Sequence, residues 1–138
     1  MSTPSPAGQP VPGRILGLGT DIIEVVRIGH MLDRHGEQFL RRVYTTTEVE
    51  YCQARRDHTQ HFAGRWAAKE AVMKTLGTGW AHGVTFRDIE VRSNPGGRPS
   101  IVLSGGAGAK ARELGITEVL VTISHCRAYA TATAIAMG

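Results

Sequence analysis

Hydrophobic and polar positions along the chain predict strands and helices of ordinary length. The apolar, β-branched run at 14–24 predicts a buried first strand, in which Gly17 and Gly19 indicate the close approach of another backbone or a ligand. Helical periodicity predicts helices at 27–42, 45–56, 61–76 and 105–114. Alternating positions predict strands at 86–92, 100–103, 117–124 and 129–137. We expect the first two of these strands to pair as a hairpin about the turn SNPGGRP.

The helix predicted at 61–76 has no ordinary solvent-facing side. At about 100° per residue, one of its sectors is apolar and another consists of small residues. The apolar sector holds Phe62, Trp66, Met73 and Leu76, and the small sector holds Gly64, Ala68, Ala71 and Thr75. A helix that is apolar or small nearly all round is usually buried. The last predicted strand carries an all-alanine face that suits close packing on the small sector: Ala130, Ala132, Ala134 and Ala136.

Charged residues occur in the two segments where burial is expected. Arg65, Lys69, Glu70 and Lys74 lie on the central helix, and Asp21 interrupts the first apolar strand. Burying a charge is costly unless it is paired or coordinates a metal. Because magnesium is often held by one or two carboxylates together with substrate phosphates, Asp21 and Glu70 are candidate metal ligands beside candidate phosphate-binding cations. In the alternative interpretation, Asp21 caps a turn and Glu70 pairs with Lys74 at i,i+4.

Weaker candidates lie in the turns. His125, between the last two strands, could bind a phosphate or exchange a proton, or could be structural. The GTG run at 77–79 directly follows the charged helix, so its N–H groups could reach a phosphate, although Gly77 is equally an ordinary helix end. The GGAGAK run at 105–110 lacks the spacing of a phosphate-binding P-loop.

Composition limits the class of protein. With 138 residues, of which 41% are hydrophobic and 20% charged, the chain is expected to form one soluble domain over 14–138, preceded by a disordered tail at 1–13 that does not resemble a signal peptide. No apolar run approaches the roughly 20 residues of a membrane span. Cys52 and Cys126 are far apart and form no CxxC pair, which favours a reducing, cytoplasmic setting without structural zinc.

The basic character of the chain concentrates in the helix predicted at 27–42. The net charge is +4, and this helix carries Arg27 together with further arginines. Gly29 and Gly36 weaken the prediction that the helix is continuous. A basic helix can be a solvated face, or it can dock an acidic partner through arginine–carboxylate contacts.

Several blocks of the sequence resemble one enzyme family in order and spacing. They are GLGTDIIEVVRI at 17–28, YTTTE at 44–48, FAGRWAAKEAVMKTLGTG at 62–79, FRDIEV at 86–91 and TISHCRAYATATAIA at 122–136. Together they resemble the holo-acyl-carrier-protein synthases, the small class of 4′-phosphopantetheinyl transferases. The blocks cover most of the chain after residue 13.

The resemblance implies a fold and a reaction. The fold would be α+β, a single compact domain with a mainly antiparallel sheet packed on a buried central helix. The reaction would move phosphopantetheine from coenzyme A to a serine of apo acyl carrier protein in fatty acid biosynthesis, releasing adenosine 3′,5′-bisphosphate. Subunits of the family form homotrimers with coenzyme A bound between neighbours, and the reaction needs neither nucleic acid nor membrane.

The resemblance also assigns roles to individual residues. Asp21 and Glu70 match the magnesium ligands, with pyrophosphate oxygens and water completing the shell. Lys74 and His125 match positions near the 3′-phosphate of coenzyme A. The remaining assignments are Arg65 and Lys69 beside the pyrophosphate or at the subunit contact, Gly77 at the coenzyme A site, and Arg27 on the helix that docks the carrier protein.

Two other readings stay open at this point. One is a non-catalytic module that binds coenzyme A, a nucleotide or RNA through its basic surface, although such a module gains nothing from paired carboxylates. The other is the same chemistry serving the carrier domain of a polyketide or peptide synthase.

Overall fold

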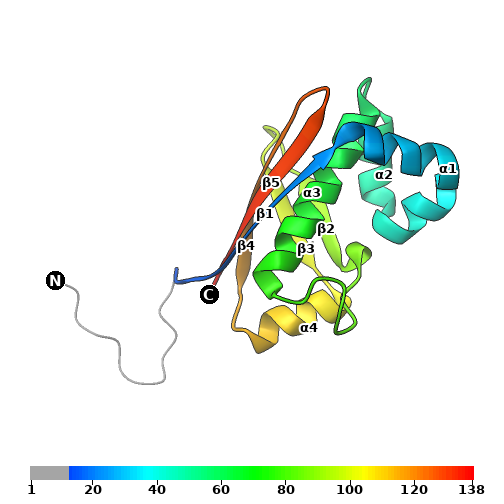
Figure 1. The fold of residues 1–138 in the computed structure, drawn as a ribbon. Helices are drawn as coiled ribbons and strands as arrows, with labels where there is room; N and C mark the ends of the chain where they lie inside the picture. The colour runs from blue at the N-terminus through cyan, green and yellow to red at the C-terminus, as the bar shows by residue number, and fades with distance from the viewer. Residues whose placement is uncertain (1–12) are drawn as a thin grey trace, which may run out of the picture.

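The computed structural model of the protein describes residues 13–138, so the expected disordered tail at 1–13 lies, except for Gly13, outside the described residues. The chain runs through β1 (Ile15–Glu24), α1 (Val25–Val43), α2 (Thr46–Gln53), α3 (His58–Leu76), the 3-10 turn η1 (Phe86–Asp88), β2 (Ile89–Ser93), β3 (Pro99–Leu103), α4 (Gly105–Glu113), β4 (Glu118–His125) and β5 (Tyr129–Met137) (Figure 1).

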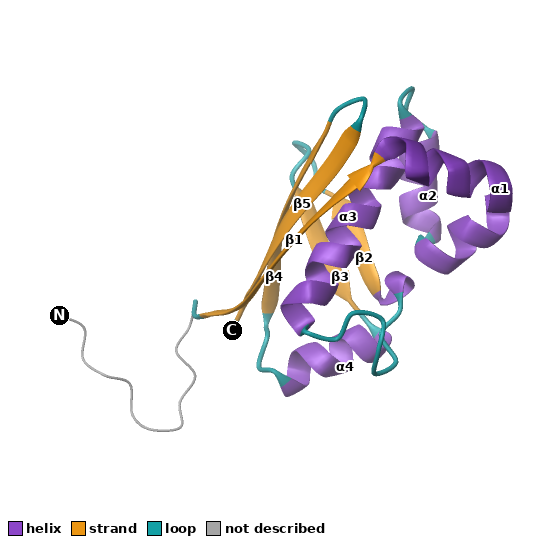
Figure 2. Ribbon diagram, in the orientation of Figure 1, coloured by secondary structure: helices purple, strands orange, loops and turns teal. Residues whose placement is uncertain are grey.

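Helix α3 is the centre of an α+β fold, as expected. β1, β5 and β4 form an antiparallel sheet in the order β1-β5-β4, and β2 pairs with β3 as a separate antiparallel hairpin. The strands therefore make two sheets, where a single mainly antiparallel sheet was expected. In Figure 2, α1 and α2 lie on the side of α3 away from the β1-β5-β4 sheet.

The close packing predicted between α3 and the sheet is confirmed. The alanines of β5 are all buried: Ala130, Ala132, Ala134 and Ala136. A Cβ added to Gly17 would lie 2.7 Å from the carbonyl oxygen of Thr75, and one added to Gly19 would collide with the carbonyl oxygen of Ala71. The two glycines thus let β1 approach the backbone of α3, which brings Asp21 to the helix that carries Glu70.

Local signals set most of the remaining boundaries. Thr45 and Glu48 form a reciprocal capping box that starts α2. Gly77 ends α3 in the left-handed conformation, with φ of 71°. Gly36, with φ of 46°, breaks α1 internally, whereas Gly29 does not.

One predicted strand begins later than expected. The segment predicted to be extended from Phe86 opens with η1, because the Asp88 carboxylate accepts a hydrogen bond from the backbone N–H of Thr85 at 3.1 Å and closes a turn. The strand starts at Ile89, which is buried together with Val91, as the alternation predicted. Among the helices described over 13–138, none combines the length and apolar character needed to cross a membrane.

Candidate active site

Asp21, Glu70 and Lys74 meet where β1 crosses α3. The Lys74 ammonium donates to the Asp21 carboxylate at 3.3 Å and to the backbone carbonyl of Thr20 at 2.7 Å. Glu70 lies one helical turn before Lys74, and its carboxylate feels the charge of Asp21. Within residues 13–138 no ion pair joins Glu70 to Lys74, so the alternative of a simple i,i+4 pair is not what the structure contains.

The surroundings of both carboxylates, Asp21 and Glu70, disfavour the charged form. Burial raises the pKa of Asp21, and the hydrogen bond and charge of Lys74 oppose the rise only partly. Burial also raises the pKa of Glu70, and the neighbouring Asp21 charge adds to it. The positive charge of Lys74 acts in the opposite direction and lowers the pKa of Glu70. A pair of partly buried anions that share one lysine has the electrostatics of a cation site.

The donor set fits magnesium. Over the described residues 13–138 no group of three or more His, Cys, Asp or Glu side chains gathers to hold a metal. Asp21 and Glu70 would therefore supply two oxygen donors and leave most of the coordination shell to waters and substrate phosphates, which is the usual arrangement for Mg²⁺. Zinc, which prefers nitrogen and sulfur donors in larger protein sets, fits poorly.

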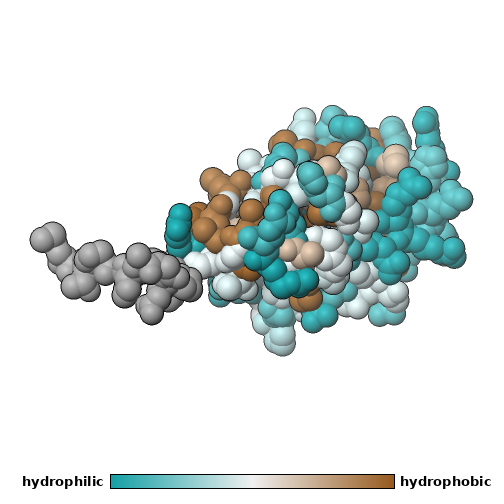
Figure 3. Space-filling view, turned by 90° about the horizontal axis from the view of Figure 1, so that it is seen from below, coloured by the Kyte–Doolittle hydropathy of each residue, from teal (hydrophilic) through white to brown (hydrophobic). Residues whose placement is uncertain are grey.

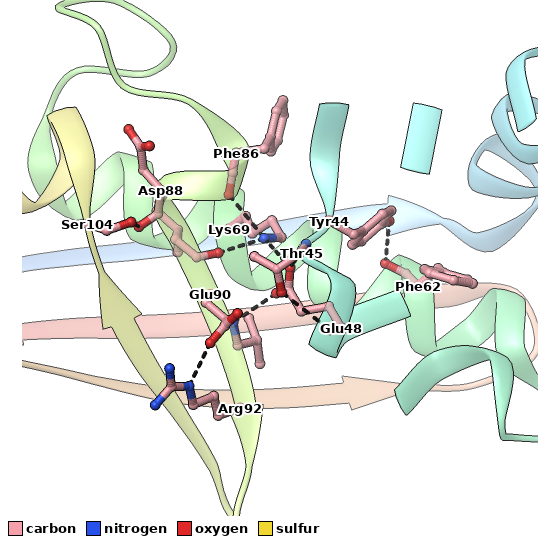
Figure 4. A network of polar contacts seen from close by, with 12 residues as sticks. Tyr44, Thr45, Glu48, Phe62, Lys69, Phe86, Asp88, Glu90, Arg92 and Ser104 are labelled. Carbon is pink, nitrogen blue, oxygen red and sulfur yellow. Dashed lines mark hydrogen bonds and ion pairs between the residues drawn. The ribbon is translucent and has the colours of Figure 1, made fainter. Parts of the chain in front are cut away.

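Lys69 corrects one expectation from the sequence. Its side chain and that of Glu48 are both 0% exposed. The Lys69 ammonium donates to Glu48 Oε1 at 2.7 Å, to the carbonyl of Phe86 at 3.0 Å and to the carbonyl of Ile89 at 2.6 Å (Figure 4). An ammonium has three donors. All three are used inside the protein, so Lys69 has none for coenzyme A and its role is structural.

Gly77 corrects a second expectation. Its backbone N–H is directed back into the helix, toward the carbonyls of Met73 and Lys74 at 3.1 and 3.2 Å. That N–H is therefore committed to the C-cap of α3 and does not face a phosphate. The residue instead sends the chain into the loop that carries Trp80.

Arg65 and His125 belong to a second cluster, toward the N-terminal end of α3. The Arg65 guanidinium donates to Ser93 Oγ at 2.7 Å and lies 3.9 Å from the ring centroid of Tyr51. His125 Nδ1 lies 3.0 Å from Gln60 Oε1. The His125 ring centroid is 4.8 Å from that of His61.

This cluster is separate from the carboxylate pair within one subunit. None of the hydrogen bonds or ring contacts of His125 within residues 13–138 reaches Asp21, Glu70 or Lys74. Arg65 is almost fully buried, and its Nε has no partner in the described part of the chain. The structure thus brings Asp21, Glu70 and Lys74 together and leaves Arg65 and His125 apart from them.

A cavity of about 870 Å³ lies between α1, Trp66 of α3 and the segment from Trp80 to Phe86. Its wall is aromatic and basic, with Phe39, Trp66, Trp80, Phe86, Arg41 and Arg42 among the lining residues. Arg27 is exposed on the first turn of α1, the helix that supplies one side of this wall. Sequence reasoning missed Trp80, whose only signal was its place directly after the GTG run.

Comparison with known proteins identifies the chain as a phosphopantetheinyl transferase. Residues 17–134 match the family model of the 4′-phosphopantetheinyl transferase superfamily. A holo-[acyl-carrier-protein] synthase of Gloeobacter violaceus is 49% identical over 133 residues, which cover 96% of this chain and 98% of that protein. A synthase of Koribacter versatilis is 47% identical over 121 residues, covering 88% of this chain and 97% of that protein.

Solved structures give the same assignment. The crystal structure of the Neisseria meningitidis synthase matches with a TM-score of 0.81 at 30% identity, covering 89% of this chain and 98% of that chain. The Helicobacter pylori synthase, solved in complex with coenzyme A, matches with a TM-score of 0.77 at 30% identity, covering 86% and 98%. The chain therefore belongs to the holo-acyl-carrier-protein synthases. This family of enzymes transfers phosphopantetheine from coenzyme A to apo acyl carrier protein.

Proposed function

We propose that this chain carries out the family reaction with Asp21 and Glu70 as the ligands of a catalytic Mg²⁺ and Lys74 as the neighbouring cation. The observation that carries the proposal is the pair of partly buried carboxylates, both with raised pKa, facing one another across β1 and α3. When bound, the metal would neutralise pyrophosphate charge and polarise the phosphate under attack. Lys74 already lies 3.3 Å from Asp21 and so would add positive charge beside the same phosphates.

We place the second cluster on the far part of coenzyme A. Because His125 does not reach the carboxylate pair of its own subunit, it would meet a ligand that spans two subunits. His125 is exposed and able to donate to a phosphate. Arg65, which is nearly buried, would support that surface through Tyr51 and Ser93 rather than contact the ligand directly.

A homotrimer is supported by the outer face of the β1-β5-β4 sheet. Leu18 and Ile22 of β1 are 67% and 63% exposed, and Leu120 of β4 is also exposed. Figure 3 shows hydrophobic side chains at the surface beside the start of the described chain. Burying this face against copies of the same chain would remove it from water. An Ile22→Lys protein that sediments as a trimer would contradict this assignment, and the expected result is a monomer.

The carrier protein would dock on α1 and beside the aromatic cavity. Arg27 is exposed on α1, and Arg41 and Arg42 border the cavity next to Trp80. Acidic helices suit this arginine-bearing surface, and steering by charge speeds encounter. We propose the fatty acid carrier protein as the substrate and the cytoplasm as the location. Both cysteines, buried Cys52 and exposed Cys126, are free, which supports a reducing setting.

The direct test is the intact mass of apo carrier protein after incubation with this protein, coenzyme A and Mg²⁺. We expect a gain of one phosphopantetheine that disappears with chelator. A folded protein that retains coenzyme A and modifies no carrier would make it a binding module instead. Faster modification of a polyketide or peptide synthase carrier than of the fatty acid carrier would reassign the substrate.

A further inference from the structure

The imidazole of His125 is held by the N-terminal half of α3. Its Nδ1 lies 3.0 Å from Oε1 of Gln60. The end of β4 can come this close to the helix because residue 64 is a glycine: a Cβ on Gly64 would lie 2.9 Å from Cγ2 of Ile123 and 3.9 Å from Cδ2 of His125. The last residue of β4 therefore packs against α3, although its side chain stays exposed.

The contact with Gln60 sets which ring nitrogen of His125 carries a proton. An amide oxygen can only accept a hydrogen bond, so Nδ1 of His125 is the donor. In the neutral ring, Nε2 would then be an acceptor and could not donate to an anion. Binding of a phosphate at Nε2 therefore requires the imidazolium, in which one N–H is held by Gln60 and the other is free for the ligand.

His61 lies beside this ring and does not oppose a charge on it. The ring centroids of His61 and His125 are 4.8 Å apart, and the ring planes meet at 67°. Nε2 of His61 lies 3.2 Å from Oδ1 of Asp57, and burial lowers the pKa of His61 despite that carboxylate. His61 is therefore neutral at pH 7, so a charge on His125 meets no second imidazolium.

The groups around this histidine pair favour an anion of the kind that coenzyme A carries. The guanidinium carbons of Arg55 and Arg65 lie 3.4 and 3.9 Å from the ring centroid of Tyr51. The ring centroid of Tyr51 lies 5.8 Å from that of His61. Coenzyme A bears a pyrophosphate and a separate 3′-phosphate. Because the pyrophosphate is assigned to the metal at the carboxylate pair, the 3′-phosphate is the group left for His125.

We propose that Gln60 is a positioning residue for coenzyme A: its amide oxygen holds Nδ1–H of His125, so that Nε2–H is free to donate to the 3′-phosphate. The hydrogen bond made by one ring nitrogen of a histidine sets the state of the other. Gln60 acts through His125 and touches neither coenzyme A nor the reacting atoms. This inference rests on the proposed placement of His125 at the far part of coenzyme A.

The test is calorimetric titration of coenzyme A, and separately of dephospho-coenzyme A, into the full chain with Mg²⁺ and no carrier protein. Gln60→Met keeps the length of the side chain and removes the amide oxygen. We expect its dissociation constant for coenzyme A to rise about three- to tenfold, the size of one lost hydrogen bond, at an unchanged melting temperature. The dissociation constant for dephospho-coenzyme A, which lacks the 3′-phosphate, should stay that of wild type. The matched control, Gln53→Met, alters an exposed glutamine at the end of α2 and should change neither constant.

His125→Ala checks that the effect of Gln60 passes through the histidine. Gln60→Met should add nothing to the loss of coenzyme A affinity in a His125→Ala background, because both changes remove one contact with the phosphate. Unchanged binding in Gln60→Met, equal losses for the two compounds, or a further loss in the His125→Ala background would overturn the positioning role alone. A wild-type chain that binds both compounds with equal affinity would overturn the placement of His125 at the 3′-phosphate, and one that binds neither would overturn the proposed function.

Discussion

Lys69 and Glu70 are neighbours on α3, yet their side chains lie in opposite environments. Lys69 is buried in the core and donates to three acceptors, one of which is its buried counter-ion Glu48. Glu70 is half-buried beside another carboxylate, and its pKa is raised because both burial and Asp21 oppose its charge. The fold therefore pairs the charge of Lys69 fully, whereas it disfavours the charged form of Glu70.

The difference separates structural charge from functional charge. A buried pair with every donor used cannot respond to a ligand without breaking the core, so it serves positioning at most. The charged forms of two partly buried carboxylates become more favourable when a cation binds between them. Groups with perturbed pKa values of this kind concentrate at functional sites. On sequence alone both residues were candidates for the site, Glu70 as a metal ligand and Lys69 as a cation beside the pyrophosphate or at the subunit contact.

The largest expected effect that tests the contrast between Lys69 and Glu70 is on the free energy of unfolding. Lys69→Met leaves the Glu48 carboxylate buried without its counter-charge, and removing one partner of such a pair costs roughly 3–5 kcal/mol. We expect urea unfolding to show a loss of that size. The control is Arg41→Met, which breaks the exposed Arg41–Glu37 pair and should cost about 1 kcal/mol or less. Equal losses in the two variants would remove the distinction between them.

The converse change is Glu70→Gln, which should spare the fold and stop the chemistry. We expect transfer to fall by about 100-fold or more, the scale seen when one preorganised electrostatic contact is lost. Initial rates from carrier-protein mass spectra would measure it. Glu113→Gln, an exposed change on α4, serves as the control and should retain the wild-type rate. Wild-type turnover in Glu70→Gln would place the metal elsewhere.

A smaller effect on stability and on transfer should follow from moving β1, which carries Asp21, away from α3, which carries Glu70. Gly19→Ala puts a methyl group against the carbonyl of Ala71 and pushes the strand that carries Asp21 away from α3. We expect the free energy of unfolding to fall by about 1–3 kcal/mol, as for other overpacked cores. Transfer should also need a higher Mg²⁺ concentration to reach half its maximal rate. Gly29→Ala meets no contact nearer than 3.7 Å and should be neutral or stabilising. Unaltered stability in Gly19→Ala would mean that β1 is not held close to the helix.

The smallest expected effect is on docking. Arg27→Glu changes an exposed charge distant from the core, so it should raise the KM for carrier protein by about three- to tenfold and leave the KM for coenzyme A unchanged. Steady-state kinetics with each substrate varied in turn would measure both constants. Arg98→Glu, on the exposed hairpin tip, is the control with the same charge change. Equal changes in both KM values would argue against a docking role for α1.

Sequence patterns predicted most of this architecture, because they are local. The burial of α3 followed from its lack of a polar sector. Gly17 and Gly19 indicated the close approach of another backbone or a ligand to β1, and the structure shows that the neighbour is α3. The predicted start of β2 was wrong because Asp88 closes a turn with Thr85. The alternation of apolar and polar residues along a strand does not reveal a short-range hydrogen bond of this kind.

The site was predictable only in part, because tertiary contacts decide which charges are satisfied. Asp21 and Glu70 stood out as acidic residues in apolar surroundings. Lys69 gave no sign of its role, since its partners Glu48 and Ile89 lie on other elements. Trp80 was equally hidden, because a tryptophan in a glycine-rich loop has no periodicity to place it.

Thermal unfolding of wild type and Glu70→Gln at neutral pH, each with chelator and with Mg²⁺, tests the central claim most directly. A carboxyl whose pKa is raised by folding destabilises the native state at pH values above that pKa, because its charged form is disfavoured there. Without metal, Glu70→Gln should therefore melt at the same temperature as wild type or higher. With Mg²⁺, wild type should gain stability and Glu70→Gln should not. A variant that melts lower without metal, or gains as much from Mg²⁺ as wild type, would contradict the claim that Glu70 is an unsatisfied carboxylate kept for a metal ion.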